Sequence, residues 1–190
     1  MLGFIFIAIA MMLWFYSSQY KKTVLWGNLV ISLLSAMVVL IVWLIEFFAM
    51  RTNPLDFTEA LKQLKLISII VSAYAIFAFL VTLVREMVKD IEDVEGDKAD
   101  NFKTIPLVFG IKTSKRIAFG ITILVIISLA FGQFIIYRMG LFFVFWYLLI
   151  AVQSILIFMA YNILKAQTKE DFHFLSNAAK LIMVAGILSM

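Results

Sequence analysis

Long apolar runs separated by short polar linkers make up most of the chain. A helix needs roughly 20 mostly apolar residues to cross a bilayer, and inside lipid a helix satisfies its own backbone hydrogen bonds. The runs do not alternate apolar and polar residues, as the strands of a membrane barrel would. The pattern therefore predicts an all-α, polytopic membrane helix bundle with six transmembrane helices, at residues 1–20, 24–49, 64–84, 117–137, 140–164 and 175–190.

Composition and charge support a membrane protein and predict its orientation. Hydrophobic residues make up 64% of the chain, whereas soluble domains contain about half. The first, third and fifth linkers carry eleven Lys and Arg residues, against four in the second and fourth. Basic linkers face the cytoplasm, so the net charge of +4 reflects topology and gives no reason to expect a nucleic-acid partner. We expect an integral protein of the cell (inner) membrane with its long third linker in the cytoplasm.

The third linker contains a dense acidic segment. The preceding apolar run continues into it without a proline, so we interpret it as the same helix, protruding from the membrane and breaking at or just after Gly96. At about 100° per residue, one narrow stripe of this helix holds Asp90, Asp93 and Asp97, with Glu86 beside them. Crowded carboxylates repel unless a cation lies among them, and oxygen ligands suit Mg²⁺ that also binds substrate phosphates. The alternative, a solvated acidic surface, is favoured for the residues that point the other way, Glu92 and Glu95.

Four other polar residues are candidates for the same site, and each has a second interpretation. Lys103 and Arg85 can neutralise phosphate oxygens, but a solvated loop lysine and a headgroup-level arginine would occupy the same positions. Asn28 lies about one turn inside a membrane helix, where an amide serves either as an interhelical hydrogen-bonding group or as a pocket group. Lys21 lies at the cytoplasmic end of its helix and is either an interface anchor or a further cation of the site.

Two segments are similar to motifs of one known family. The later segment runs Arg85-Glu86-x-x-Lys89-Asp90-x-x-Asp93-x-x-Gly96-Asp97 and continues with Lys103-Thr104-x-Pro106. It resembles the second aspartate-rich motif of the UbiA-type intramembrane prenyltransferases. The earlier segment resembles the one that joins the fourth and fifth helices of that family, and it runs Tyr16-Ser17-x-x-x-Lys21, followed by Gly27-Asn28.

The resemblance covers essentially the whole chain and has consequences for fold and activity. It implies nine helices around a central cavity that opens laterally to lipid. It also implies Mg²⁺-dependent transfer of a prenyl group from a prenyl diphosphate to a lipophilic acceptor. The metal would then be held by Asp90, Asp93 and Asp97, with Lys103 as a further catalytic residue. The remaining substrate contacts would come from Tyr16, Lys21, Asn28, Arg85 and Thr104.

One motif of the family is missing from the chain. The first aspartate-rich motif, of the Asn-Asp-x-x-Asp type, lies between the second and third helices of the family. The six apolar runs therefore correspond to helices four to nine. We expect residues 1–190 to form a single transmembrane prenyltransferase domain that is incomplete at its N-terminus and also at its C-terminus.

The acceptor is the least determined part of this prediction. The residue pattern of the acidic motif most resembles that of the family branch that uses geranylgeranylglyceryl phosphate as acceptor. The donor in this branch would be a geranylgeranyl or longer prenyl diphosphate. Prenylation of an aromatic quinone precursor such as 4-hydroxybenzoate is the alternative. Two further alternatives belong to other classes: a non-catalytic membrane fragment, and a transporter-like bundle, whose carboxylates would be expected at the bilayer midplane.

Overall fold

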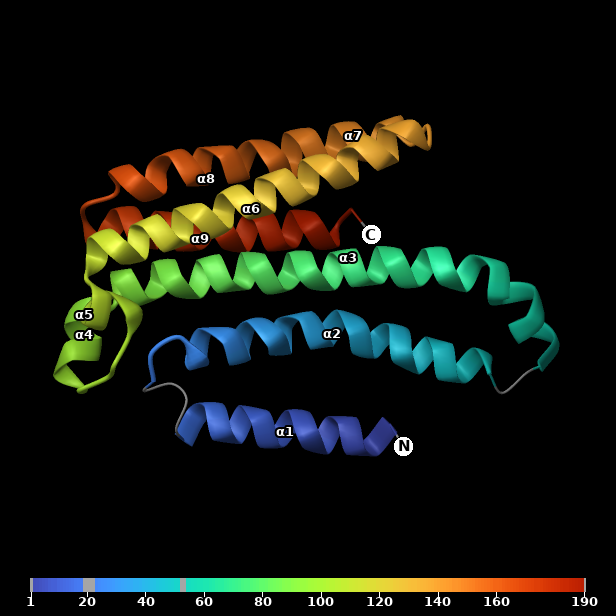
Figure 1. Cartoon of the computed structure of the whole chain (residues 1–190), viewed down its shortest axis with the longest axis horizontal. Helices are drawn as coiled ribbons and strands as arrows, with labels where there is room; N and C mark the ends of the chain where they lie inside the picture. The colour runs from blue at the N-terminus through green and yellow to red at the C-terminus, as the bar shows by residue number, and fades with distance from the viewer. Residues whose placement is uncertain (1, 19–22, 52–53, 190) are drawn as a thin grey trace.

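The computed structural model describes residues 2–18, 23–51 and 54–189, and the regular elements in these ranges are all helices, as predicted (Figure 1). The N-terminal half consists of α1 (Leu2–Ser18), α2 (Trp26–Met50) and α3 (Pro54–Glu92). Two short helices follow, α4 (Val94–Ala99) and α5 (Ile105–Phe109). The C-terminal half consists of α6 (Ile111–Arg138), α7 (Phe142–Tyr147), the π-helical turn η2 (Leu148–Gln153), α8 (Ser154–Lys165) and α9 (Lys169–Ile187).

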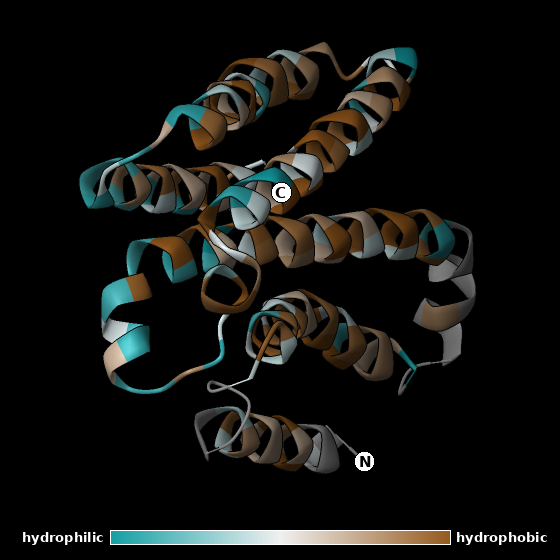
Figure 2. Cartoon of the chain, turned by 60° about the vertical axis from the view of Figure 1, so that its left-hand side comes forward, coloured by the Kyte–Doolittle hydropathy of each residue, from teal (hydrophilic) through white to brown (hydrophobic). Residues whose placement is uncertain are grey.

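Four helices of the described part are long and apolar enough to cross a membrane: Trp26–Met50, Gln63–Glu92, Ile111–Arg138 and Phe142–Lys165. Figure 2 shows apolar residues along these helices and polar residues on α4 and near the helix ends. The chain is therefore an integral membrane protein, but the predicted number of six spans is not confirmed.

The two remaining predicted spans are helical, and α9 differs from the four candidate spans in composition. For α1 (Leu2–Ser18), the described residues include the apolar helical stretch Phe6–Tyr16. Helix α9 begins with the charged residues Lys169, Glu170 and Asp171 and contains Lys180 further along. Because a charged side chain in hydrocarbon is costly, this composition is less suited to a full span than that of α2, α3 or α6.

Helix α3 is the central element of the structure. Helix α2 lies along one side of it, with α1 beyond α2, while α9 and α6 pack against the other side (Figure 1). The buried hydrophobic core lies on this second side and includes Met87, Val88, Val125, Leu156, Ile163, Leu175 and Ile182. None of the described residues of α1 or α2 belongs to that buried cluster. The position of α2 therefore depends on other contacts with α3.

The acidic helix bends earlier than the sequence predicts. Helix α3 ends at Glu92, Asp93 has φ −95° and ψ 8°, and α4 then contains Gly96, so the predicted break at or after Gly96 is wrong. The chain bends without losing its hydrogen bonds, since the Asp93 N–H donates to the Lys89 carbonyl over 2.9 Å. The helical path ends at Asn101, which has φ 55°, and the next N–H, of Phe102, donates to the Asp97 carbonyl. This is a Schellman ending, in which asparagine can replace the usual glycine.

Helix α9 begins at a capping box that connects it to the preceding turn. The Asp171 N–H donates to the Thr168 hydroxyl over 3.2 Å, and the Asp171 carboxylate accepts the N–H groups of Thr168 and Gln167 at 2.9 Å each. These backbone bonds favour the ionised form and lower the pKa of Asp171 below its usual value. The cap fixes the start of α9, and with it the position of the whole helix beside α3.

Close packing of α9 on α3 gives a test of this arrangement. A Cβ atom added at Gly186 would lie 3.0 Å from Cε1 of Phe77, whereas one added at Gly120 would meet nothing within 4 Å. We expect Gly186→Leu to lower the free energy of unfolding by about 1–3 kcal/mol, because overpacking displaces Phe77. Gly120→Leu is the matched control and should be neutral or slightly stabilising, since leucine is the better helix former. Denaturant unfolding in detergent measures both, and equal stability of the two variants would contradict the packing of α9 on α3.

Candidate active site

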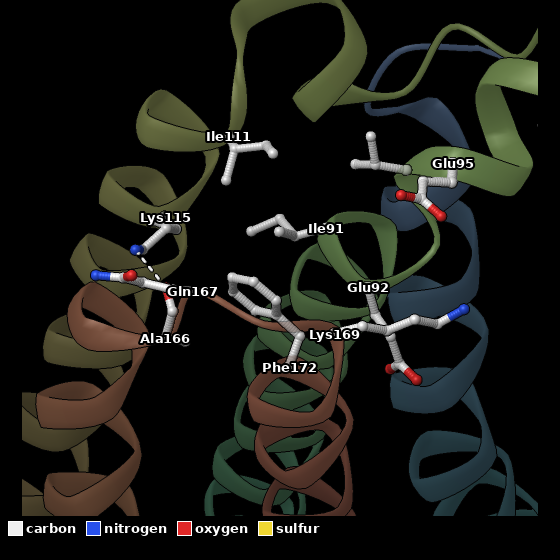
Figure 3. Close-up of a pocket in the computed structure, with 10 residues that line it drawn as sticks. Ile91, Glu92, Glu95, Ile111, Lys115, Ala166, Gln167, Lys169 and Phe172 are labelled. Atoms are coloured by element: carbon white, nitrogen blue, oxygen red, sulfur yellow. Dashed lines mark hydrogen bonds between the residues drawn. The ribbon is translucent and has the colours of Figure 1, made fainter.

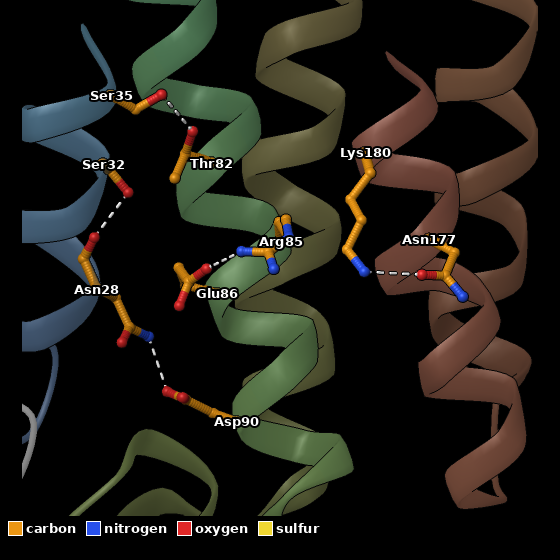
Figure 4. A network of polar contacts seen from close by, with 9 residues as sticks. All are labelled: Asn28, Ser32, Ser35, Thr82, Arg85, Glu86, Asp90, Asn177 and Lys180. Atoms are coloured by element: carbon orange, nitrogen blue, oxygen red, sulfur yellow. Dashed lines mark hydrogen bonds and ion pairs between the residues drawn. The ribbon is translucent and has the colours of Figure 1, made fainter. Parts of the chain in front are cut away.

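The two segments singled out in the sequence meet where the start of α2 lies against the end of α3. The Asn28 side-chain amide donates to Oδ2 of Asp90 over 2.7 Å (Figure 4). Further into the membrane, the Thr82 hydroxyl donates to the Ser35 hydroxyl over 3.0 Å. The contact between α2 and α3 therefore contains a line of polar groups, with Asp90 at one end of it.

Spacing in the sequence explains this polar line. Asn28, Ser32 and Ser35 recur at helical intervals along α2, and so do Thr82, Glu86 and Asp90 along α3, which places each set on one helix face. Sequence analysis missed the serines and Thr82. Their periodic placement within otherwise apolar helices was the signal that could have identified them.

Asp90 is half-buried and lies among other charges. The carboxylates of Asp97 and Glu86 are close enough to act on it electrostatically, as is the ammonium of Lys89. The Tyr16 phenol, at the end of α1, lies within electrostatic range of both Glu86 and Asp90. The structure thus brings together Tyr16, Asn28 and Asp90 from three helices. Lys21 lies outside the described residues.

The predicted metal ligands are divided between two helices by the bend. Asp90 lies on α3, Asp93 forms the junction and Asp97 lies on α4. In the described part of the chain, no three acidic or histidine side chains are gathered closely enough to hold a metal by themselves. This donor set still suits Mg²⁺, because that ion commonly uses only one or two carboxylates and takes its other ligands from water and substrate phosphates.

Thr104 provides an independent indication of a ligand near this end of α3. It is the N-cap residue of α5, yet its side chain makes no capping hydrogen bond. Its hydroxyl is buried and has no hydrogen-bond partner among the described residues. The following residue, Ile105, belongs to the hydrophobic core and holds Thr104 in place. A buried hydroxyl without a partner fits a site for phosphate oxygens, since buried polar groups are normally hydrogen-bonded. Lys103, just before it, is exposed.

Arg85 lies on α3 beside this site and is bound to a neighbour. Its guanidinium forms an ion pair with the Glu86 carboxylate, and 24% of its side chain is exposed. Glu86 itself is buried. Because this carboxylate already has a cation as partner, its negative charge is partly compensated, and Asp90 is the more available metal ligand of the two.

A cavity of about 400 Å³ lies near the same end of the bundle, but not at Asp90 (Figure 3). Glu92, Glu95, Lys115, Lys169 and Phe172 are among its lining residues. The Glu92 carboxylate contacts Nδ1 of His173 over 2.8 Å. Glu92 and Glu95 therefore point away from Asp90, as predicted, and the cavity contains none of the residues predicted to bind metal or diphosphate.

The Asn28–Asp90 contact can be tested by a double-mutant cycle. With Asn28→Ala and Asp90→Ala, we expect a coupling of about 1.5–3 kcal/mol in the free energy of unfolding, the range for hydrogen bonds to charged groups. The control cycle pairs Asn28→Ala with Glu95→Ala, whose effects should add within about 0.5 kcal/mol because the two residues do not touch. Equal coupling in both cycles would contradict the contact.

Comparison with known proteins connects this geometry to a family. The profile of the UbiA prenyltransferase family matches residues 1–182. A protein named digeranylgeranylglyceryl phosphate synthase from Methanosphaera stadtmanae is 31% identical over 113 residues, which cover 60% of this chain and 40% of that protein. Its namesake from Saccharolobus solfataricus is 30% identical over 173 residues, which cover 91% of this chain and 52% of that protein.

These matches leave part of each relative without a counterpart. A third synthase of the same name, from Thermococcus sibiricus, is 30% identical over 115 residues and is covered over 39% of its length. The chain thus spans about half the length, or less, of the curated relatives it matches. No solved structure matches the chain with significance.

Proposed function

Since the chain belongs to the UbiA prenyltransferase family, we propose that it contributes the second aspartate-rich half of a site that transfers a prenyl group from a prenyl diphosphate to a lipophilic acceptor. One observation carries this proposal. Asn28 and Asp90, from the two segments that resemble family motifs, are hydrogen-bonded although they are 62 residues apart in the chain. The Asp90 carboxylate is thereby held at one end of the polar line between α2 and α3.

The proposed ligand set is a diphosphate together with Mg²⁺. Asp90 and Asp97, with Asp93 at the bend, would hold the metal. Magnesium, when bound, stabilises the negative charge that develops on the departing diphosphate. The Thr104 hydroxyl and the Lys103 ammonium are suited to contacting the phosphate oxygens. Lys21 and Tyr16 complete the substrate-binding set inferred from the family resemblance.

The transfer itself exchanges one carbon–oxygen bond for another. The bond between the allylic carbon and the diphosphate breaks, and the diphosphate keeps the electron pair. An acceptor oxygen then bonds to that carbon, and its proton passes to the released diphosphate. The apolar surroundings exclude water, which would otherwise convert the allylic cation into an alcohol. Aromatic side chains of the helices are suited to sheltering the positive charge.

The names of the relatives support a glycerophosphate acceptor. We therefore propose geranylgeranylglyceryl phosphate as the acceptor and a geranylgeranyl or longer prenyl diphosphate as the donor. An aromatic quinone precursor such as 4-hydroxybenzoate is the second candidate acceptor. In the membrane we propose that the end of the bundle with α4 and α5 faces the cytoplasm, because the linkers at that end are the basic ones. A transporter is disfavoured, since Asp90 lies near the end of its span and not at its middle.

Asp90→Asn tests the metal role, because it keeps the size of the side chain and removes the charge. With labelled geranylgeranyl diphosphate, Mg²⁺ and the glycerophosphate lipid, we expect turnover to fall by about 100-fold or more, as when a group that stabilises transition-state charge is lost. Asp100→Asn is the matched control, since Asp100 is exposed beyond α4 and should leave turnover unchanged.

The same assay distinguishes the alternatives. Unchanged turnover in Asp90→Asn would remove the metal role assigned to this residue. Transfer to 4-hydroxybenzoate, but not to the glycerophosphate lipid, would replace the proposed acceptor. If the unsubstituted protein, including any further segments that its gene encodes, transfers no prenyl group to either acceptor, a non-catalytic membrane protein becomes the better interpretation.

A further inference from the structure

We infer that the cavity of about 400 Å³ beside the bend at Asp93 binds the zwitterionic headgroup of an aminophospholipid. The primary ammonium of the headgroup would contact Glu95, and its phosphate would contact Lys115. A bound headgroup would hold α4 in its orientation relative to α3. The lipid is bound and not converted, so this inference does not rest on the proposed function.

The cavity lies at the level of the membrane surface. Three candidate spans end or begin there, at Glu92, Ile111 and Lys165. Glu92 and Ile111 line the cavity, and so does Ala166, which follows Lys165. Lipid headgroups occupy the level at which spans leave the hydrocarbon. The volume lies within the range of about 300–1,000 Å³ that is usual for small-molecule sites. A headgroup is therefore the part of a lipid that suits this cavity.

Opposite charges stand on opposite sides of the cavity, with apolar residues between them (Figure 3). The Lys115 ammonium of α6 lies on one side, and the carboxylates of Glu92 and Glu95 lie on the other. Ile91 and Phe172, each 4% exposed, lie between the two sides. An occupant that suits both sides carries a cation and an anion joined by a short apolar linker.

Of the two carboxylates, Glu95 is the one available to an ammonium. Glu92 already contacts Nδ1 of His173 over 2.8 Å. Lys169 lies near Glu92 as well, since both line a second, smaller pocket. Glu95 is exposed and forms no ion pair in the described part of the chain. A primary ammonium carries three hydrogen-bond donors and a full charge, which makes it a strong partner for such a carboxylate.

Lys115 is held in place and keeps its charge. Its ammonium donates to the neutral carbonyl of Ala166 over 2.7 Å. Asp171 lies within electrostatic range of Lys115, but within the described ranges the two form no ion pair. The Asp171 carboxylate is occupied by the backbone N–H groups of the α9 cap. The remaining hydrogens of the Lys115 ammonium can therefore be donated to phosphate oxygens.

The cavity borders both sides of the bend that divides the acidic residues. Glu92 ends α3, Val94 begins α4, and both line the cavity together with Glu95. None of the residues Val94–Ala99 is buried, so packing does little to fix α4. A headgroup bound between Glu95 and Lys115 would connect α4 to α6. We therefore expect a bound headgroup to suppress local opening of α4.

The contrasting interpretation is a solvent-filled crevice lined by ordinary surface charges. The two interpretations differ in specificity for the headgroup. Phosphatidylcholine has the same phosphate, but its trimethylammonium has no hydrogen to donate to a carboxylate. Phosphatidylglycerol has the phosphate and no cation. A crevice without a binding site would not distinguish these lipids from phosphatidylethanolamine.

The experiment measures binding of dihexanoyl phosphatidylethanolamine to the detergent-solubilised protein by isothermal titration calorimetry. We expect dihexanoyl phosphatidylcholine and phosphatidylglycerol to bind about tenfold more weakly, because each lacks one half of the contact. Free phosphoethanolamine is the probe for a soluble occupant. It should also bind about tenfold more weakly, because it lacks the apolar chains that would lie along the adjoining spans.

Two substitutions test the two halves of the site. Glu95→Gln and Lys115→Met should each lower affinity for phosphatidylethanolamine about tenfold, whereas Lys115→Arg should keep most of it. Lys112→Met removes an exposed lysine at the start of α6 that does not line the cavity, and this matched control should bind normally. If Lys115→Met does not fold, Glu95→Gln still decides the question, because Glu95 is exposed.

Hydrogen exchange reports on the bend. The Asp97 N–H of α4 donates to the Asp93 carbonyl over 2.9 Å. Phosphatidylethanolamine should slow exchange of this amide about tenfold in the unsubstituted protein and leave it unchanged in Glu95→Gln.

Several outcomes would overturn the inference. It fails if the three lipids bind equally, or if Glu95→Gln binds phosphatidylethanolamine as well as the unsubstituted protein does. It also fails if free phosphoethanolamine binds as strongly as the lipid, because the occupant would then be a soluble zwitterion. Binding without any slowing of exchange at Asp97 would refute the effect on the bend. None of these measurements uses prenyl transfer, so failure of the proposed reaction would leave the inference standing.

Discussion

The hydrogen bond between the Asn28 amide and the Asp90 carboxylate is the contact on which the candidate site depends. The buried hydrophobic core joins α3 to α6, α8 and α9 and contains no described residue of α1 or α2. Helix α2 buries Leu34, Ala36 and Ile41 outside that core and adds polar contacts with α3. The Asn28–Asp90 bond is the polar contact at the site. Both partners are half-buried, and the charge of the carboxylate makes this bond stronger than one between neutral groups. The bond holds the start of α2 against the end of α3, within electrostatic range of the Tyr16 phenol.

Sequence alone predicted the helices well wherever a long apolar run determines them. The run at 24–49 became α2, Trp26–Met50, nearly unchanged. The six-span count is not confirmed at α1 and α9 in the described part of the chain. Helix α9 has a charged first turn, and Lys180 lies further along the same helix. These charges make α9 less apolar than the four candidate spans. The bend at Asp93 carries no proline or glycine signal. The true end of the acidic segment is the left-handed Asn101, which sequence analysis overlooked in favour of Gly96.

The sequence predicted which residues belong to the candidate site, but it did not predict the contacts between them. The family resemblance identified Asn28 and Asp90 as site residues. The angular spacing of residues along one helix cannot show that two residues 62 positions apart, on different helices, are in contact. The prediction from helical spacing placed Asp90, Asp93 and Asp97 on one straight helix. The bend at Asp93 instead divides them between α3 and α4. Thr104 shows the opposite case. Its sequence neighbours suggest an ordinary N-cap, and only the structure reveals a buried hydroxyl that does no capping.

Helix α3 presents two carboxylates toward α2, and they differ in how their negative charge is compensated. Glu86 forms an ion pair with Arg85, whereas Asp90 accepts a hydrogen bond from the neutral amide of Asn28. The negative charge of Asp90 therefore requires a further cation before a diphosphate can approach. A magnesium ion meets this requirement, because it can bind one or two carboxylates and take its other ligands from phosphate oxygens and water. The difference between the two partners thus explains why Asp90, and not Glu86, is the proposed ligand.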